Sequence, residues 1–160
     1  MIFITTGTQE PFDRLVKVAD EIAALLPGVP FKVQAFISVY KASNIEIINF
    51  MSPVEFEDNL KKASLIISHA GMGTIISALV NQKPIIVMPR LLKYKEHRNE
   101  HQLATARKLD ELQYIDVAYD EKELQEKVLD MWPDKLRCLH QVGKFASARL
   151  IDSLKGFIDE

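Results

Sequence analysis

The stretch Leu65-Ile66-Ile67-Ser68-His69-Ala70-Gly71-Met72-Gly73-Thr74 decides the fold class, because an apolar run ends in a glycine turn that leads into a helical pattern. Similar short runs alternate with helical segments along the chain, which is typical of an α/β fold built from βαβ units. Six strands are predicted: Ile2 to Thr5, Phe31 to Phe36, Ile45 to Asn49, Leu65 to Ser68, Ile85 to Met88 and Tyr114 to Val117. Their nearly continuous apolar character indicates a parallel sheet with helices on both faces.

Helix signals lie between these strands. Apolar residues from Phe12 to Leu26 recur at helical spacing, and Pro27-Gly28 ends that pattern. Ser52-Pro53-Val54-Glu55 combines an N-cap, a proline at the first helical position and a capping-box glutamate. Further helices are predicted over Pro53 to Ala63, Leu103 to Leu112, about Asp120 to Trp132, and about Asp134 to the C-terminus.

Two segments leave alternatives open. Only Ile37 to Asn44 separate the second and third strands, which is too short for a crossover of about a dozen residues with its helix. That connection is either a crossover made by a loop alone, or a sign that these strands are not neighbours.

The last predicted helix carries the apolar stripe Leu136, Leu139, Gly143, Ala146, Leu150, Leu154 and Phe157. This stripe fits packing on the domain's own sheet and docking onto another chain equally well.

Length and charge exclude several classes of protein. The chain has 160 residues, enough for one domain (1–160) but too few for a complete two-domain enzyme. With 20 Lys+Arg against 22 Asp+Glu it has no basic footprint, so we expect no nucleic-acid partner. A single cysteine, Cys138, and a start without signal-peptide character predict the cytoplasm. No apolar run approaches the roughly 20 residues of a membrane span, so a membrane role would need a partner or a surface face.

Two polar loops are candidate ligand contacts, because ligands of parallel α/β sheets bind at the carboxyl ends of the strands. The first strand leads into Thr5-Thr6-Gly7-Thr8-Gln9, and the fourth into Ser68 to Thr74. Glycine, threonine hydroxyls and a helix N-terminus together suit a diphosphate, although a glycine turn is also ordinary in this fold. Ile76 stands where a third glycine of a dinucleotide fingerprint would be, and no P-loop motif occurs.

A third loop follows the fifth strand and contains His97-Arg98-Asn99-Glu100-His101-Gln102. Its His-x-x-Glu-His spacing is that of inverted zinc proteases, but a strand-to-helix loop lacks the helix and the further ligand that such enzymes need. The loop is therefore either a solvated charged surface or a set of donors for a polar ligand, to which Arg90 would contribute. His69 is either a satisfied core histidine or a phosphate donor, and its glycine turn favours the phosphate role. His140 and Cys138 are expected to be structural.

Four segments, in this order, resemble the C-terminal, donor-binding domain of family 28 glycosyltransferases: Ile2-Phe3-Ile4-Thr5-Thr6-Gly7-Thr8, Ser68-His69-Ala70-Gly71-Met72-Gly73-Thr74, Lys83-Pro84-Ile85-Ile86-Val87-Met88-Pro89-Arg90 and Glu96-His97-Arg98-Asn99-Glu100-His101-Gln102. The resemblance spans about residues 1 to 130. It is greatest to the stand-alone small subunits of split transferases, those of the dolichol pathway and of bacterial exopolysaccharide and capsule synthesis. It implies a Rossmann-like six-stranded parallel sheet that forms one half of a GT-B enzyme, with no metal or other cofactor.

The resemblance also implies roles for individual residues. The diphosphate of a UDP-sugar would contact Thr6, Gly7, Thr8, His69, Gly71, Gly73 and Thr74. Phe50 and Met51 would lie against the base, and the sugar would contact Arg98, Glu100, His101 and Gln102. Family members usually carry a ribose-binding glutamate three residues after the threonine of Gly-x-Gly-Thr, where this chain has Ser77. Either Ser77 contacts the ribose, or another side chain takes that role.

By the same resemblance, the chain would be the donor subunit of an inverting hexosyltransferase whose catalytic base lies on a partner. That partner would be membrane-associated and hold a lipid-linked saccharide, so the chain would be peripheral at the inner face of the membrane. Residues 134–160 are then the candidate docking helix. The alternative is a non-catalytic nucleotide-sugar-binding module that regulates or enhances a partner transferase. A flavodoxin-like signalling domain ranks last, because the N-terminal acidic cluster and later lysine of a phosphoacceptor site are lacking.

Overall fold

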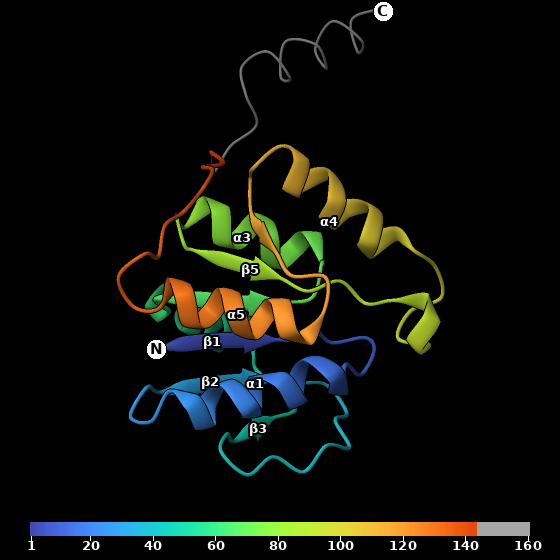
Figure 1. Cartoon of the computed structure of the whole chain (residues 1–160), viewed down its shortest axis with the longest axis vertical. Helices are drawn as coiled ribbons and strands as arrows, with labels where there is room; N and C mark the ends of the chain where they lie inside the picture. Colours follow the sequence, from blue (N-terminus) through green and yellow to red (C-terminus); the bar gives the residue numbers. More distant parts are fainter. Residues whose placement is uncertain (144–160) are drawn as a thin grey trace, which may run out of the picture.

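Six parallel strands form one sheet in the computed structural model, which describes residues 1–143 (Figure 1). The strands are β1 (Ile2–Thr5), β2 (Phe31–Gln34), β3 (Ile47–Ile48), β4 (Leu65–Ser68), β5 (Ile85–Val87) and β6 (Asp116–Val117). Their order is β3-β2-β1-β4-β5-β6, so the direction of winding reverses between β1 and β4. All six predicted strands are present, and the Rossmann-like α/β fold is confirmed.

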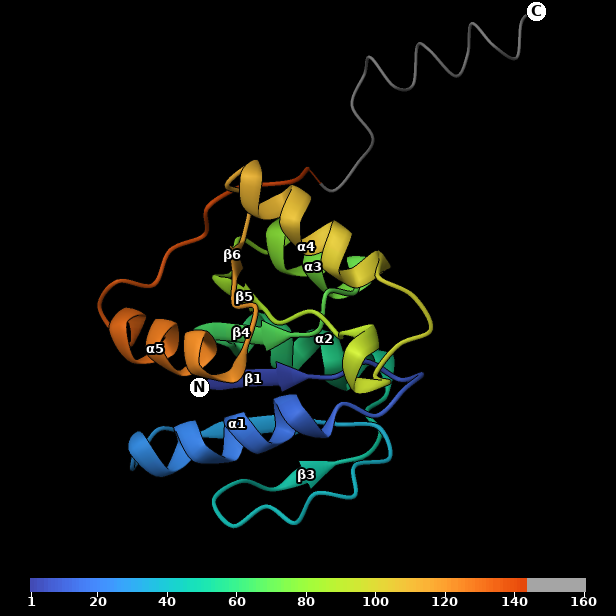
Figure 2. The same ribbon diagram turned by 45° about the vertical axis from the view of Figure 1, so that its right-hand side comes forward.

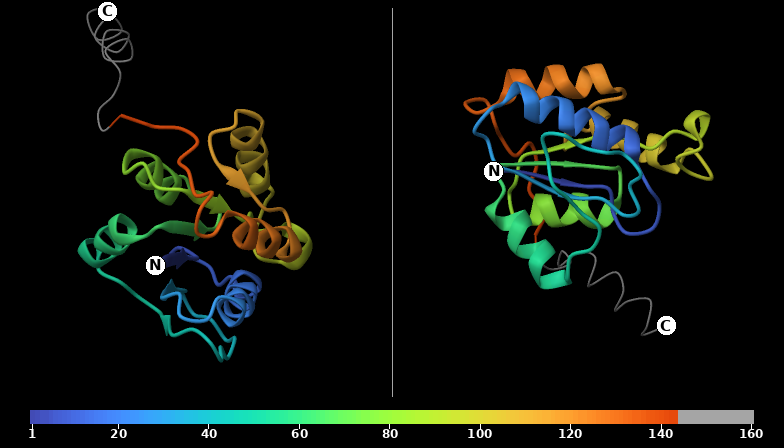
Figure 3. Two further views of the ribbon diagram at one scale, coloured as in Figure 1. Left: turned by 60° about the vertical axis from the view of Figure 1, so that its left-hand side comes forward. Right: turned by 90° about the horizontal axis from the view of Figure 1, so that it is seen from below.

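Helices cover both faces of this sheet, as predicted. They are α1 (Asp13–Leu25), α2 (Pro53–Lys62), α3 (Met72–Val80), α4 (His101–Glu111) and α5 (Glu121–Met131), with a 3-10 turn η1 (Leu92–Tyr94) before α4. Figure 3 shows α1 and α5 on one side of the strands and α2 and α3 on the other. The alternation of side chains along β1 explains the two cores: Ile2 and Ile4 pack with α1 and α5, whereas Phe3 packs with α2, α3 and α4.

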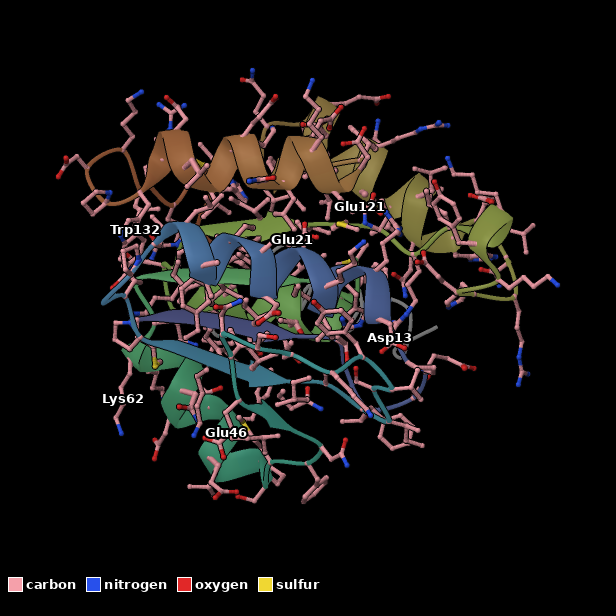
Figure 4. All side chains as sticks on the ribbon, turned by 60° about the horizontal axis from the view of Figure 1, so that its bottom comes forward. Asp13, Glu21, Glu46, Lys62, Glu121 and Trp132 are labelled. Atoms are coloured by element: carbon pink, nitrogen blue, oxygen red, sulfur yellow. The ribbon has the colours of Figure 1, made fainter. Side chains whose placement is uncertain are left out.

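The helix starts follow the capping signals in the sequence. The Ser52 hydroxyl accepts a hydrogen bond from the Glu55 backbone N–H, and the Glu55 carboxylate accepts one from the Ser52 N–H, which completes the predicted capping box. Asp120 caps α5 by accepting from the Glu123 N–H. Figure 4 shows α5 beside α1, with their first residues, Glu121 and Asp13, at the same end.

The connection between β2 and β3 is a crossover made by a loop alone. β2 and β3 pair in parallel, so these strands are neighbours. The buried carboxylate of Asp20, on α1, accepts hydrogen bonds from the backbone N–H groups of Ser43 and Asn44 and from the Tyr40 hydroxyl. Burial acts to raise the pKa of Asp20, but these hydrogen bonds outweigh burial and hold the pKa below its ordinary value. An anchored loop therefore takes the place of a crossover helix.

The prediction of a helix beginning at Asp134 is wrong for the residues that the structure describes. After α5, residues 132–135 form a turn and residues 136–143 are irregular. Leu136 packs against the core on the α1 side, whereas Cys138 and Val142 pack against the core on the other side. The ring of His140 stacks on Tyr114, with 3.7 Å between ring centroids. The apolar residues of this crossing segment (residues 132–143) thus serve two cores, and positions 144–160 of the predicted helix lie outside the described residues.

Replacing Asp20 tests the anchored loop. Asp20→Asn should lower the free energy of unfolding by about 1–3 kcal/mol at neutral pH, because a side-chain amide presents N–H groups to backbone donors. The half-exposed neighbour Glu21, whose carboxylate lies 3.9 Å from Lys17 Nζ, supplies the control Glu21→Gln, with a change within about 0.5 kcal/mol. Urea unfolding measures both.

The same variant also tests how the stabilisation by Asp20 depends on pH. Because the pKa of Asp20 lies below its ordinary value of 3.8, its contribution is present at neutral pH and is lost as the pH falls through the folded-state pKa. The difference between wild type and Asp20→Asn should therefore shrink in acid. A difference that persists unchanged at low pH contradicts a role for the ionised carboxylate.

Candidate functional site

A cavity of about 660 Å³ lies at the carboxyl edge of the sheet, where the winding reverses. This volume is within the roughly 300–1,000 Å³ that is typical of small-molecule sites. Figure 2 shows the strand arrows pointing toward this edge, where the loop after β1 and the η1 turn lie. Most of the predicted contact residues line the cavity: Thr6, Gly7, Thr8, Phe50, Met51, His69, Gly71, Gly73, Thr74 and Gln102.

Four predicted contact residues do not line it. Ser77 lies on α3 outside the cavity wall, and Arg98, Glu100 and His101 are exposed around the start of α4. The structure thus brings together the residues expected to contact the diphosphate and the base. Of the residues expected to contact the sugar, only Gln102 lines the cavity. Gln102 is buried, and its side-chain oxygen accepts a hydrogen bond from the backbone N–H of Arg90.

The imidazole of His69 fills the space between the two glycine loops. A Cβ on Gly71 would lie 2.2 Å from His69 Nε2, and a Cβ on Gly7 would lie 2.7 Å from Cε1. Gly7 also has a φ of +79°, which only glycine adopts without strain. A Cβ on Gly73, by contrast, would face open space. Glycines 7 and 71 are therefore required by the histidine ring, a reason that the sequence pattern did not reveal.

His69 is neutral at physiological pH. Burial lowers its pKa to about 4, and the nearby cation of Arg90 acts in the same direction. Its Nδ1 is buried and has no hydrogen-bond partner among residues 1–143. A hydrogen bond with the Thr5 backbone acts in the opposite direction on the pKa of His69, but burial outweighs it.

Arg90 supplies the positive charge of the cavity wall. It is only 3% exposed, and its Nη2 donates to the backbone oxygens of Thr6, at 2.7 Å, and Glu10. Burial lowers the pKa of Arg90 to about 10, so the guanidinium stays charged at neutral pH. Its Nε has no partner within the described part of the chain. Sequence reasoning placed Arg90 near this edge but not among the diphosphate contacts.

A second arginine fixes the loop that follows β5. Arg14, on α1, forms a two-pronged ion pair with Glu96, with nitrogen–oxygen distances of 2.7 and 2.8 Å. The same guanidinium donates to the backbone oxygen of Pro89, and Glu96 accepts from the Leu91 N–H. These contacts hold the chain on both sides of Arg90, which keeps that side chain in the cavity wall.

The start of α3 adds an uncapped helix N-terminus to the polar end of the cavity. Its N-cap is Gly71, which has no side chain to cap the helix. Gly73 and Thr74, in the first turn, line the cavity. The first N–H groups of a helix and its dipole favour an anion at such a position. The polar end therefore combines a buried cation, an unpaired imidazole nitrogen and a helix N-terminus.

The opposite end of the cavity is apolar. Sequence reasoning placed Phe50 and Met51 here but missed the α2 residues Pro53, Phe56 and Glu57, which line the same end. Phe56 packs edge-to-face on Phe3, with 5.4 Å between centroids, so α2 is held against the sheet. Thr5, Gln9 and His97 also line the cavity; they belong to the predicted loops but were given no contact. Glu10 and Gln34, which no motif included, complete the lining.

Two further findings bear on the alternatives raised by the sequence. Among residues 1–143, no three His, Cys, Asp or Glu side chains are grouped so as to hold a metal ion, so His97, Glu100 and His101 do not form a zinc site. None of the helices in the described part of the chain has the length and hydrophobicity of a membrane span.

Comparisons with known proteins agree on one family. Residues 1–154 match the model of the glycosyltransferase family 28 C-terminal domain. "UDP-N-acetylglucosamine transferase subunit ALG13" of Candida albicans is 36% identical over 92 residues, which are 58% of this chain and 30% of the relative. The protein of the same name from Cryptococcus neoformans is 32% identical over 118 residues, covering 71% and 56%. The chain thus spans about half or less of these curated relatives.

Solved structures show the same fold. An NMR structure of ALG13 superposes with a TM-score of 0.58 at 20% identity, covering 96% of this chain and 93% of that one. The glycosyltransferase of kitacinnamycin gives a TM-score of 0.60 at 19% identity, covering 83% and 35%. Acinetobacter baumannii MurG gives 0.54 at 17% identity, covering 84% and 41%.

A pair of glycine variants tests the packing of His69. Gly71→Ala should lower the free energy of unfolding by about 1–3 kcal/mol, because its methyl group overlaps the imidazole. Gly73→Ala places the same methyl group in open space inside α3 and should leave stability equal or slightly higher. Urea unfolding of both variants compares them, and equal effects would show that the ring does not depend on Gly71.

Proposed function

The chain belongs to the glycosyltransferase family 28 C-terminal domains, and on this premise we propose that it is the donor-binding subunit of an inverting glycosyltransferase. Its donor is a UDP-sugar, which carries a hexose-type sugar. The observation that carries the proposal is the two-ended cavity at the switch point of the sheet, polar at His69 and Arg90 and apolar at Phe50 and Met51. A nucleoside diphosphate likewise has a charged diphosphate at one end and a planar base at the other.

The polar end suits the diphosphate. Arg90 offers a desolvated cation, the α3 N-terminus offers backbone N–H groups, and Thr6, Thr8 and Thr74 offer hydroxyls. His69 and Arg90 line this end, and each keeps one buried nitrogen without a hydrogen-bond partner among residues 1–143. These groups can compensate the charge of a diphosphate without a metal ion.

The apolar end suits the uracil base. Met51 is buried in the wall, whereas Phe50 is 70% exposed at its rim, where a planar ring can cover one face of a base. The sugar then points toward the loop before α4. Gln102 lines the cavity there, and Arg98, Glu100 and His101 would reach the sugar from the exposed surface.

In the transfer step, an acceptor hydroxyl oxygen attacks the anomeric carbon from the face opposite the diphosphate. The bond from that carbon to the diphosphate oxygen breaks, and the hydroxyl proton passes to a general base. Arg90 and the α3 N-terminus stabilise the charge that develops on the departing diphosphate. His69 is a poor base at neutral pH because its pKa is about 4, so we assign the base to a partner subunit.

The partner is, in this proposal, a membrane-associated subunit that holds a lipid-linked saccharide. The printed names of the curated relatives support a subunit role, since they describe a UDP-N-acetylglucosamine transferase subunit. The chain would then be cytoplasmic and peripheral at the inner face of the membrane. Because Leu136, Cys138 and Val142 pack on the chain's own cores, docking is left to residues 144–160 of the predicted element. Exopolysaccharide synthesis and N-glycan synthesis are both compatible with such a donor subunit.

UDP binding tests the donor site. Isothermal titration should show binding to the wild-type chain, and His69→Ala should weaken it by roughly 10-fold or more through loss of a phosphate contact. His101→Ala is the matched control, because His101 is exposed outside the cavity wall and should leave UDP affinity unchanged. Absence of UDP binding to the folded wild-type chain would refute the donor site.

Activity with the membrane subunit separates the proposal from its alternative. Ser77 lies outside the cavity wall, which favours a second candidate: a nucleotide-sugar-binding module that only enhances a partner transferase. A donor subunit predicts no sugar transfer by the partner alone, and a loss of about 10- to 100-fold with His69→Ala in the reconstituted pair. Transfer by the partner alone, merely increased by the chain, would establish the enhancer role instead.

A further inference from the structure

Arg90 is a buried cation that forms no ion pair with a carboxylate among residues 1–143. Its guanidinium donates to the backbone oxygens of Thr6 and Glu10, and neither of these acceptors carries a formal charge. A buried cation without a counter-ion favours the binding of an anion, which is the role proposed for this end of the cavity. Yet the loop that follows Arg90 contains a carboxylate, Glu96, which could itself be that anion.

Glu96 lies close to Arg90. Its Oε2 accepts a hydrogen bond from the backbone N–H of Leu91, the residue after Arg90, at 2.9 Å. Burial lowers the pKa of Arg90 and the charge of Glu96 acts to raise it, so the carboxylate acts on this cation across the loop. The Glu96 side chain is only 11% exposed, so water screens its charge little. A free Glu96 carboxylate would therefore compete with a bound anion for Arg90.

Arg14, on α1, engages both oxygens of the Glu96 carboxylate. Its Nε lies 2.7 Å from Oε1, and its Nη2 lies 2.8 Å from Oε2. This is the two-pronged, charge-assisted pairing that the planar guanidinium allows. The Arg14 guanidinium lies over the Phe12 ring at 5.3 Å, and that of Arg90 lies over the same ring at 5.0 Å. Two cations thus lie near one carboxylate, and within the described part of the chain the ion pair of Glu96 is with Arg14.

We propose that Arg14 is a positioning residue that holds the Glu96 carboxylate away from Arg90, and so keeps the Arg90 cation free for the diphosphate of the donor. This inference rests on the proposed function, because it needs a diphosphate at the polar end of the cavity. Without Arg14, the carboxylate would lose its counter-ion beside Arg90. An uncompensated buried charge is costly, so Glu96 would pair with Arg90 and take the place of the ligand. Because this competitor belongs to the same chain, its effective concentration would be high.

The test measures the binding of UDP and of uridine to the full chain by NMR titration. Arg14→Met should weaken UDP binding by roughly 10-fold or more, and should leave uridine binding unchanged because uridine has no diphosphate. Adding Glu96→Gln to Arg14→Met should restore UDP affinity to within about 3-fold of the wild type, because the competing charge is then removed as well. If the ion pair only held the loop in shape, the second substitution would bring no such recovery.

Lys17→Met is the matched control for the lost positive charge. Lys17 lies on the same helix as Arg14, its side chain is 62% exposed, and its nearest carboxylate contact is with Glu21 at 3.9 Å. This variant should leave UDP affinity unchanged, because an exposed charge is screened by solvent. A loss of UDP affinity equal to that of Arg14→Met would show that only the overall charge of the chain matters, which would overturn the inference.

Glu96→Gln alone tests the inference even if Arg14→Met does not fold. The glutamine oxygen can still accept from the Leu91 N–H, and Arg14 keeps its bond to the Pro89 backbone oxygen. UDP affinity should then equal or exceed that of the wild type, whereas a weaker affinity would mean that the ion pair serves the shape of the loop. If the wild-type chain does not bind UDP, the proposed function fails. If it does, and Arg14→Met binds UDP equally well, only the role of Arg14 fails.

Discussion

Parallel pairing of β1 with β4 is the constraint on which the rest of the site depends. The register sets Thr5 opposite Ser68, so the two strands end at the same level and their loops leave side by side. The imidazole of His69 then lies between these loops, against Gly7 and Gly71. This pairing thereby requires glycine at both positions and brings the start of α3 beside the loop after β1.

Two arginines extend this arrangement to the third loop. Arg90 bonds to the backbone of the loop after β1, and Arg14 pairs with Glu96 on the loop after β5. Their guanidinium groups lie over the same ring, Phe12, at 5.0 Å and 5.3 Å. The loops after β1 and β5 are thus joined by contacts to backbone oxygens and to one buried aromatic ring. Such a wall is organised before any ligand binds, which limits the entropy that binding would cost.

Much of the fold follows from local patterns, and the site follows only in part. Apolar runs and capping residues such as Ser52 predict the strands and helices because these signals act over a few residues. The role of Gly71 depends on the position of the His69 ring, so it is not visible in sequence spacing. Leu136 fits a helical stripe by period alone, but the structure places it in an irregular segment whose next apolar residues, Cys138 and Val142, pack on the opposite side of the sheet.

The anchored loop between β2 and β3 links the charge of Asp20, on α1, to local opening of the cavity wall near β3. β3 has two residues and pairs only with β2, and its attachment relies on the Asp20 carboxylate rather than on a packed crossover helix. Phe50 and Met51 follow soon after β3, so the apolar end of the cavity begins beside a two-residue edge strand. Amides of this edge should exchange with solvent by a local opening that leaves β1 and β4 intact. Exchange at the apolar end of the cavity should then be faster than at the polar end, which follows β1 and β4.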